Sequence, residues 1–154
     1  TEIDNDRIIK IVDFLLSDNK KVVLASQTPE SKEMGELRLN LFDAFLFREN
    51  RLPTASELRG LERSLFDNYI VRQSKVNRQL ELFIEQANSP NATFADRAEF
   101  SCNKPKKRCY LFFPEPQVKT LYDYGHITNS GAKEFARIID QKKWLSQIFP
   151  EGEK

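Results

Sequence analysis

The chain lacks any apolar run that approaches the ~20 residues of a membrane-spanning helix, and it has almost no net charge. Its 24 Lys and Arg residues nearly balance 23 Asp and Glu residues, for a formal charge of +1 at pH 7. No global field therefore favours binding to nucleic acid or to an anionic membrane. Met and Trp occur once each, whereas Phe occurs 12 times, so Phe must supply much of the core. A length of 154 residues suits one domain and is short for two.

Cysteine is scarce as well. Cys102 and Cys109 enclose a basic loop of six residues, 103–108, and they can either form a local disulfide or remain two free thiols beside a turn. A disulfide would add about 2–3 kcal/mol to stability and would indicate an oxidising compartment. Zinc bound by these two cysteines with Asp123 and His126 is disfavoured. Structural zinc sites usually combine a closer cysteine pair with a second close pair of ligands.

The only histidine stands in the most informative segment of the chain, which reads Tyr122-Asp123-Tyr124-Gly125-His126-Ile127-Thr128-Asn129-Ser130-Gly131-Ala132. In a tight turn, the Asp123 carboxylate can accept a hydrogen bond from one imidazole nitrogen and leave the other free to take a proton. This is the base-and-orienter half of a Ser-His-Asp mechanism. Gly125 is expected to have a positive φ or to permit a close approach within the turn.

This segment resembles the last conserved block of the SGNH (GDSL-like) hydrolases, an Asp-x-x-His followed by Leu/Ile-Thr/Ser-x-x-Gly-Ala and a helix. The likeness is closest to SGNH domains attached to membrane acyltransferases of the acyltransferase-three family, which modify sugars. Those domains often carry a paired-cysteine loop before a strand of the form Leu-Tyr-x-Asp-x-x-His, the order found here from Cys102 to His126. Residues 21–30 resemble the family's middle strand and its Pro-containing loop. The resemblance spans residues 8 to 143 and implies a three-layer α/β/α, flavodoxin-like fold with a helical insert.

The first block of the family, Gly-Asp-Ser, has no counterpart, because no Asp-Ser dipeptide occurs in the chain. The second and third blocks, which supply an oxyanion-hole Gly and Asn, are not recognisable either. In the family these blocks precede the middle strand. We therefore expect residues 1–154 to form a single unit that is the C-terminal part of a larger SGNH-like domain. A degenerate domain that has lost its nucleophile is the alternative.

Hydrophobic periodicity places these motifs on a series of predicted elements. A helix capped by Asp4 or Asn5 is expected to precede a short, fully buried strand over 22–25. A helical stretch over 36–50 is expected next. A Thr54–Glu57 capping box then begins either one long helix or two helices broken near 67–68, which end at 88–91. A weak strand within 93–100, a β-prone segment at 110–113 and a terminal helix over 130–145 complete the prediction. About three strands are expected in all.

The resemblance assigns His126 as the general base and Asp123 as the residue that orients it. Tyr122, Tyr124 and Gly125 are weaker candidates for binding the substrate. The two tyrosines could line an acyl or sugar pocket, but packing explains their presence equally well.

No serine stands out as the nucleophile. Ser26 follows a predicted strand but lacks the flanking Gly and Asp, and Ser130 better fits a helix cap. A basic cluster is most simply a solvated loop, with an anionic glycan or lipid headgroup as the alternative contact; it consists of Lys104, Lys106, Lys107 and Arg108.

The resemblance implies an extracytoplasmic O-acyltransferase or esterase domain that acts on carbohydrate O-acyl groups, commonly acetyl. Its serine would lie outside this chain, and no metal or organic cofactor would be required. The expected partners are an acylated glycan, an N-terminal remainder of the domain and a membrane acyltransferase part, but not nucleic acid, since stacking aromatics are not interleaved with the basic cluster. The alternatives are a non-catalytic extracytoplasmic interaction domain that retains the scaffold, and an unrelated α/β domain in which Asp123-x-x-His126 is a coincidence.

Overall fold

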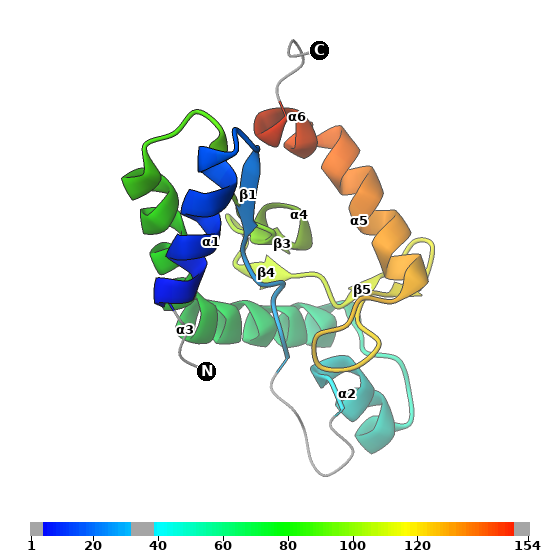
Figure 1. Cartoon of the computed structure of the whole chain (residues 1–154). Coiled ribbons are helices and arrows are strands. Elements are labelled where there is room, and N and C mark those ends of the chain that lie inside the picture. Colours follow the sequence, from blue (N-terminus) through cyan, green and yellow to red (C-terminus); the bar gives the residue numbers. More distant parts are fainter. Residues whose placement is uncertain (1–4, 32–38, 150–154) are drawn as a thin grey trace.

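The central feature of the computed structural model, which describes residues 5–31 and 39–149, is a pair of parallel strands. Strand β1 (Val22–Ala25) follows helix α1 (Asn5–Ser17), and strand β2 (Ala92–Ala95) follows the long helix α3 (Ala55–Ala87). Parallel strands need a long crossover connection. The segment that contains α2 (Leu41–Glu49) and α3 provides it (Figure 1).

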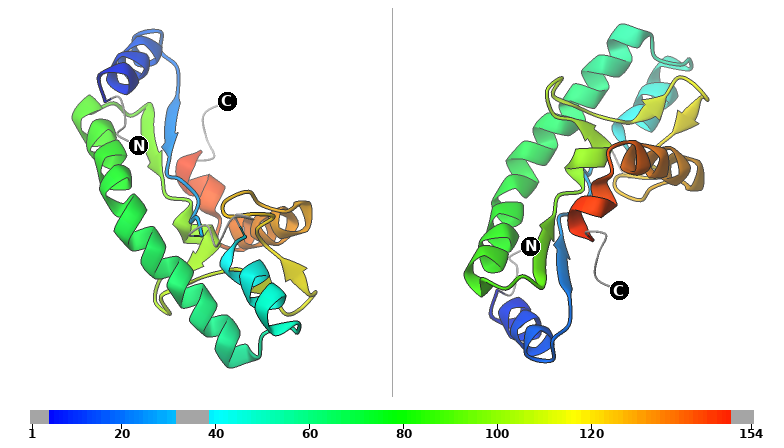
Figure 2. Two further views of the ribbon diagram at one scale, coloured as in Figure 1. Left: turned by 90° about the horizontal axis from the view of Figure 1, so that it is seen from below. Right: turned by 90° about the horizontal axis from the view of Figure 1, so that it is seen from above.

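Helices lie on both sides of this pair. Helix α3 runs along one side, and α5 (Asn129–Gln141) and α6 (Trp144–Ile148) lie on the other (Figure 2). Val23, Ala25 and Ala95 pack with the C-terminal helices, as expected when alternate strand residues face one layer. The predicted α/β character is present, but two four-residue strands are too few to form the predicted three-layer flavodoxin-like sheet.

Strand β1 lies where the sequence predicted it, but the prediction of full burial was wrong. Val22 is buried, whereas the other three residues are only partly buried. Within the described residues β1 pairs on one edge alone, with β2, and a strand with one covered edge cannot be enclosed like the centre of a wide sheet.

The helix predicted over 36–50 is α2, which begins only at Leu41 because Asn40 caps it. The Asn40 Oδ1 atom accepts a hydrogen bond from the Asp43 N–H at 2.9 Å. An N-cap residue has extended rather than helical backbone angles, so the helix cannot include Asn40. Residues 36–38 lie outside the described part of the chain.

Helix α3 begins at the predicted capping box. Thr54 Oγ1 accepts from the Glu57 N–H at 3.3 Å, and Glu57 Oε2 accepts from the Thr54 N–H at 2.8 Å. Of the two predicted alternatives, the single long helix is correct, since α3 continues to Asn88, where a left-handed conformation ends it. No helix in residues 5–31 and 39–149 is both long and apolar enough to span a membrane, α3 included.

The segment after β2 folds into a short helix and two tight hairpins. Helix α4 (Ala98–Ser101) leads into β3 (Cys102–Asn103), which pairs with β4 (Arg108–Cys109). The next hairpin joins β5 (Phe112–Phe113) to β6 (Val118–Lys119). The expected total of about three strands was therefore wrong for the described residues, which form six. Four of the six have two residues each, too short for an alternating pattern to reveal.

The C-terminal helix is also divided, in contrast to the single helix predicted over 130–145. Lys143 adopts a left-handed conformation with φ 51° and separates α5 from α6. The change of direction allows Trp144 to pack edge-on against Phe100, with ring centroids 5.1 Å apart. Packing of the only tryptophan thus overrides the helical spacing that continues through this position.

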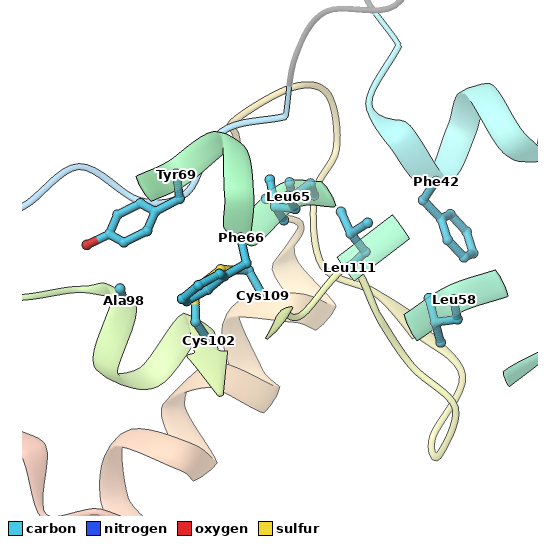
Figure 3. Close-up of a cluster of buried hydrophobic side chains, with 10 residues drawn as sticks. Phe42, Leu58, Leu65, Phe66, Tyr69, Ala98, Cys102, Cys109 and Leu111 are labelled. Carbon is cyan, nitrogen blue, oxygen red and sulfur yellow. A yellow bond between two sulfur atoms is a disulfide. The ribbon is translucent and has the colours of Figure 1, made fainter. Parts of the chain in front are cut away.

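The main core lies where α3 meets the first hairpin (Figure 3). Leu65, Phe66 and Tyr69 of α3 pack with Leu111 and with a disulfide between Cys102 and Cys109. Of the two predicted states of these cysteines, the disulfide is the one present, and each cysteine is 1% exposed. The bond therefore links the hairpin inside the core and does not merely close a surface loop.

Candidate active site

The segment containing the only histidine forms a closed turn between β6 and α5. An isolated antiparallel bridge pairs Leu121 with Ile127, and the Tyr122 N–H donates to the His126 carbonyl at 2.6 Å. Inside the turn, Asp123 Oδ1 accepts from the backbone N–H groups of Gly125 at 3.0 Å and His126 at 2.9 Å. A carboxylate that accepts from the N–H two residues ahead forms an Asx turn, so the spacing of the two residues is fixed locally.

The other carboxylate oxygen of Asp123 bonds to the imidazole of His126. The distance from Asp123 Oδ2 to His126 Nδ1 is 2.7 Å. Because an ionised carboxylate only accepts, this contact favours the tautomer with the proton on Nδ1 and a free lone pair on Nε2. Nε2 forms no hydrogen bond with a described residue, and the imidazole side chain is 74% exposed. The pair thus presents a basic nitrogen to the surface.

The turn keeps Asp123 ionised. Hydrogen bonds from the Gly125 and His126 N–H groups, with a further contribution from the imidazole, lower the pKa of Asp123 to about 2. Each of these donors stabilises the charged form. Asp123 is therefore a carboxylate throughout the neutral pH range, the state required to hold the Nδ1 proton and to stabilise an imidazolium.

Gly125 lies close to the Glu30 side chain. A Cβ at this position would lie 3.0 Å from Glu30 Cγ, and Gly125 has no positive φ in the left-handed range. The predicted positive φ is absent, and the close approach is to the Glu30 side chain of the loop after β1 and not within the turn as predicted. The neighbouring Ser31 N–H donates to the Tyr124 carbonyl at 2.7 Å, so the loop after β1 is fastened to the histidine turn.

The continuation Thr-x-x-Gly-Ala fastens the turn to α5. Thr128 caps the helix by accepting from the Gly131 N–H at 2.8 Å, and its hydroxyl donates to the Lys119 carbonyl at 2.6 Å. A Cβ on Gly131 would lie 2.7 Å from the Thr120 carbonyl oxygen. Ser130 was predicted as a cap, and this was wrong because Thr128 holds that position.

The two tyrosines of the turn differ in their surroundings. The Tyr124 ring lies edge-on to the imidazole, with centroids 6.0 Å apart, whereas Tyr122 is 73% exposed. Leu121 and Ile127 line a cavity of only about 10 Å³, too small for a ligand. Within the described residues the Asp123–His126 pair therefore stands on an open surface.

The other sequence candidates are engaged elsewhere. Ser26 is 1% exposed, and its hydroxyl donates to Asp96 Oδ1 at 3.1 Å and accepts from the Arg97 N–H at 2.7 Å. It has a structural role and no contact with His126. The zinc alternative fails because Cys102 and Cys109 are bonded to each other.

Two members of the predicted basic cluster have acidic partners. Lys104 lies 2.6 Å from Asp96, and Arg108 lies 3.8 Å from Glu62. Burial raises the pKa of Glu62, against the opposing effects of the Leu111 N–H and Arg108. Lys106 and Lys107 are exposed, as a solvated loop requires.

A polar network beside the turn was missed from the sequence. Lys119 Nζ donates to both carboxylate oxygens of Asp43, each at 2.9 Å, and lies 3.5 Å from the Tyr122 carbonyl. Asn40, which is 0% exposed, donates to Asp43 Oδ2 and to the Leu121 carbonyl. The network ties α2 to the chain that enters the turn. The sequence does hold a signal for Asn40, because an Asn directly before an apolar helical stretch is a typical N-cap. The prediction of a helix from residue 36 overlooked it.

A second missed network is centred on Asp96, just after β2. Tyr69 and Ser26 donate to its carboxylate, and Asn77 Nδ2 donates to the Tyr69 hydroxyl at 3.0 Å. Burial opposes ionisation of Asp96, but the Lys104 hydrogen bond and the Ala98 N–H outweigh it and lower its pKa. Burial, together with Asp96, raises the pKa of the Tyr69 phenol. The sequence does hold a signal for this network, because a polar residue directly follows each of the two parallel strands. These residues are Ser26 after β1 and Asp96 after β2.

A parallel βαβ-type pair, a disulfide-bonded hairpin and an Asp-x-x-His turn at the start of a helix together define an α/β domain with the features that the SGNH resemblance predicts. Comparison with protein families agrees. Residues 2–141 match the family described as SGNH domain (fused to AT3 domains), and the chain belongs to this family. The unrelated α/β domain considered above is thereby excluded. Among curated proteins and solved structures, the comparisons found no match.

Proposed function

We propose that this chain contributes the histidine and aspartate of an SGNH-type O-acyltransferase or esterase that acts on O-acyl groups, commonly acetyl, of carbohydrates. The observation that carries the proposal is the 2.7 Å hydrogen bond from His126 Nδ1 to Asp123 Oδ2, which leaves Nε2 free at the surface. Membership of a family whose domains are fused to AT3 domains supports acyl transfer as the reaction class.

In the proposed mechanism, His126 Nε2 takes the proton of a serine hydroxyl as the serine oxygen attacks the acyl carbonyl carbon. Asp123 holds the imidazole in the required tautomer and stabilises the imidazolium. Nε2 then returns the proton to the leaving alcohol, and a covalent acyl-serine remains. Water or a sugar hydroxyl attacks this intermediate in the second step, again with His126 as base. The scheme needs no metal or organic cofactor.

We further propose that the nucleophilic serine lies outside residues 1–154, within a larger three-layer SGNH-like domain of which these residues are the C-terminal part. The lack of any Asp-Ser dipeptide and the structural engagement of Ser26 support this view. Tyr124, beside the imidazole, and Tyr122 and Gly125 in the same turn are the proposed contacts for the acyl or sugar group.

An extracytoplasmic location, attached to a membrane acyltransferase part, completes the proposal. The disulfide supports an oxidising compartment, because such bonds persist outside the cytosol. The fusion of family members to AT3 domains supports a membrane-bound partner part.

Hydrolysis of p-nitrophenyl acetate by the full-length protein tests the proposal. We expect His126→Ala and Asp123→Asn each to lower kcat/KM by about 10²–10⁴-fold, since one variant removes the base and the other removes its orienting acceptor. Asp140→Asn is the matched control, because Asp140 and Lys143 form another exposed pair with the same i,i+3 spacing. This variant should retain the parent rate.

Equal rates in the parent and in His126→Ala, with folding intact by circular dichroism, would contradict catalysis by His126. That result would favour the alternative, a non-catalytic interaction domain that retains the SGNH scaffold.

A further inference from the structure

The turn that connects α3 to β2 carries a motif that the histidine site does not use. Asn91-Ala92-Thr93 has the form Asn-x-Thr with a residue other than Pro in the middle, which is the acceptor sequence for N-glycosylation. No other Asn-x-Ser or Asn-x-Thr triplet occurs in the 154 residues. Because a three-residue motif also arises by chance, the surroundings of the asparagine decide whether it can carry a glycan.

The backbone of Asn91 is held in place without the help of its side chain. Its N–H donates to Ser89 Oγ at 3.2 Å, and its carbonyl accepts from the Val22 N–H at 2.7 Å. Asn91 is partly exposed, and the neighbouring Asn88 and Pro90 are exposed. The carboxamide therefore belongs to an ordered surface turn whose backbone hydrogen bonds do not depend on it.

The carboxamide nitrogen of Asn91 has a proton to spare. Nδ2 donates to Asn19 Oδ1 at 3.1 Å, in a surface contact between the turn after α3 and the turn after α1, and it makes no other hydrogen bond with a described residue. A carboxamide nitrogen has two protons, and N-glycosylation replaces one of them with carbon. The remaining proton can still serve Asn19, so the modification need not break any hydrogen bond among the described residues.

The turn stands away from the histidine site. Asn91 lies where both parallel strands begin, whereas the loop that bonds to the histidine turn, through Ser31 and Tyr124, follows the other end of β1 (Figure 1). A four-residue strand is about 13 Å long. A glycan on Asn91 would therefore extend from the opposite end of the strand pair and leave the His126 imidazole open to substrate.

The disulfide is an independent indication. Cys102 and Cys109 are each 1% exposed and are bonded to each other inside the core, which favours folding in an oxidising compartment. In eukaryotic cells the secretory lumen both forms disulfides and contains the enzyme that glycosylates Asn-x-Thr triplets. The motif and the disulfide thus point to the same compartment for different chemical reasons.

We propose that Asn91 is an N-glycosylation site, with Thr93 as the hydroxyl residue that recognition requires. The donor is an oligosaccharide linked to a polyprenyl pyrophosphate lipid. Asn91 Nδ2 attacks the anomeric carbon of the first sugar and loses one proton to a base of the transferring enzyme. The new N–C bond replaces the bond from that carbon to a pyrophosphate oxygen. The pyrophosphate leaves on the lipid, and nothing is oxidised or reduced. This modification is distinct from acyl transfer at His126 and rests only on the extracytoplasmic location in the proposed function.

Peptide mapping of the full-length protein, purified from its own organism, tests the site. Trypsin cleaves after Arg78 and Arg97 and releases residues 79–97, which contain Asn88 and Asn91. Peptide N-glycosidase in ¹⁸O-water converts a glycosylated asparagine into ¹⁸O-labelled aspartate. We expect the label at Asn91 and none at Asn88. Asn88 is the matched control within the same peptide, because a proline follows it two residues later in place of Ser or Thr.

Substitutions at Thr93 separate recognition of the motif from folding. Thr93→Ala, expressed in cells of the same organism, should lose the label, whereas Thr93→Ser should keep it because the hydroxyl remains. Asn91→Gln should abolish the mass that the glycosidase removes from this peptide. Its p-nitrophenyl acetate hydrolysis should equal that of the parent, since the turn lies at the opposite end of the strand pair from His126.

A tryptic peptide recovered entirely without glycan would overturn the proposal, as would a label that persists in Thr93→Ala or one that appears at Asn88. An unglycosylated protein whose disulfide is intact overturns the glycan alone, because that bond forms in any oxidising compartment. Loss of esterase activity in His126→Ala bears only on the proposed function, so the two can fail separately.

Discussion

At the scale of single residues, Asp123 owes its low pKa first to the backbone of its own turn. The N–H groups of Gly125 and His126 are the two largest causes, ahead of the imidazole. The carboxylate is thus ionised and oriented before the histidine contributes, and the pair is preorganised by four consecutive residues. Short sequence separation is also why this contact was predictable: Asp-x-Gly-His permits an Asx turn whatever the rest of the chain does.

The titration of Asp123 in His126→Ala tests this origin. The backbone N–H donors remain in the variant, so the pKa of Asp123 should stay well below the ordinary value of about 3.9. The measurement is the ¹³C shift of the Asp123 carboxyl carbon as a function of pH. A rise to the ordinary value in the variant would show that the imidazole, and not the turn, depresses the pKa.

The low pKa of Asp123 implies that the stability of the fold depends on pH. Because the folded pKa of about 2 lies below the unfolded value of about 3.9, ionised Asp123 stabilises the fold above about pH 4. That contribution declines as the pH falls through the folded pKa. Asp123→Asn should therefore be less stable than the parent at pH 7, and the difference should shrink between about pH 4 and pH 2. Urea unfolding across this range measures it, and a constant difference would contradict the linkage.

At the scale of elements, the junction between the turn and α5 depends on Gly131. This residue is buried in the first turn of α5, and the Thr120 backbone fills the space where a side chain would lie. The Thr-x-x-Gly spacing therefore has two separate reasons, a cap by Thr128 and a backbone contact at Gly131. Local patterns predicted the start of a helix here but placed its cap at Ser130, because capping propensity alone does not distinguish neighbouring hydroxyl residues.

Gly131→Ala and Gly60→Ala are a matched pair for this contact. A Cβ at Gly131 meets the Thr120 carbonyl oxygen at 2.7 Å and Thr120 Cα at 2.8 Å, whereas a Cβ at Gly60 in α3 meets nothing within 4 Å. We expect Gly131→Ala to lower the free energy of unfolding by about 1–3 kcal/mol. Gly60→Ala should raise it by about 0.5–1 kcal/mol, since alanine favours a helix interior. Urea unfolding compares the two, and equal effects would show that Thr120 can yield.

At the scale of the whole molecule, tertiary packing decided what local patterns could not. Packing of Trp144 against Phe100 divides the terminal helix. Glu62, Asp96 and Lys119 form hydrogen bonds with residues 49, 70 and 76 positions away. Helices α1, α3 and the Asp123–His126 turn depend on nearby residues and were predicted. A cavity of about 400 Å³ lined by Asn77, Asp96, Glu99 and Trp144 depends on α3, β2, α4 and α6 together, so no single stretch of sequence indicates it.

The disulfide joins the two strands of the first hairpin inside the core, so its removal should destabilise the whole molecule. Cys102 and Cys109 are both fully enclosed in the core cluster between α3 and the first hairpin (Figure 3). A bond across a separation of 7 residues should restrict the unfolded chain by about 2–3 kcal/mol. Cys102→Ser with Cys109→Ser should lose at least that much, because two hydroxyls also replace apolar sulfurs in the core. Thermal unfolding with and without dithiothreitol measures the loss. The parent should fall toward the double variant in reductant, and the double variant should not respond; an insensitive parent would mean that the hairpin is held by packing alone.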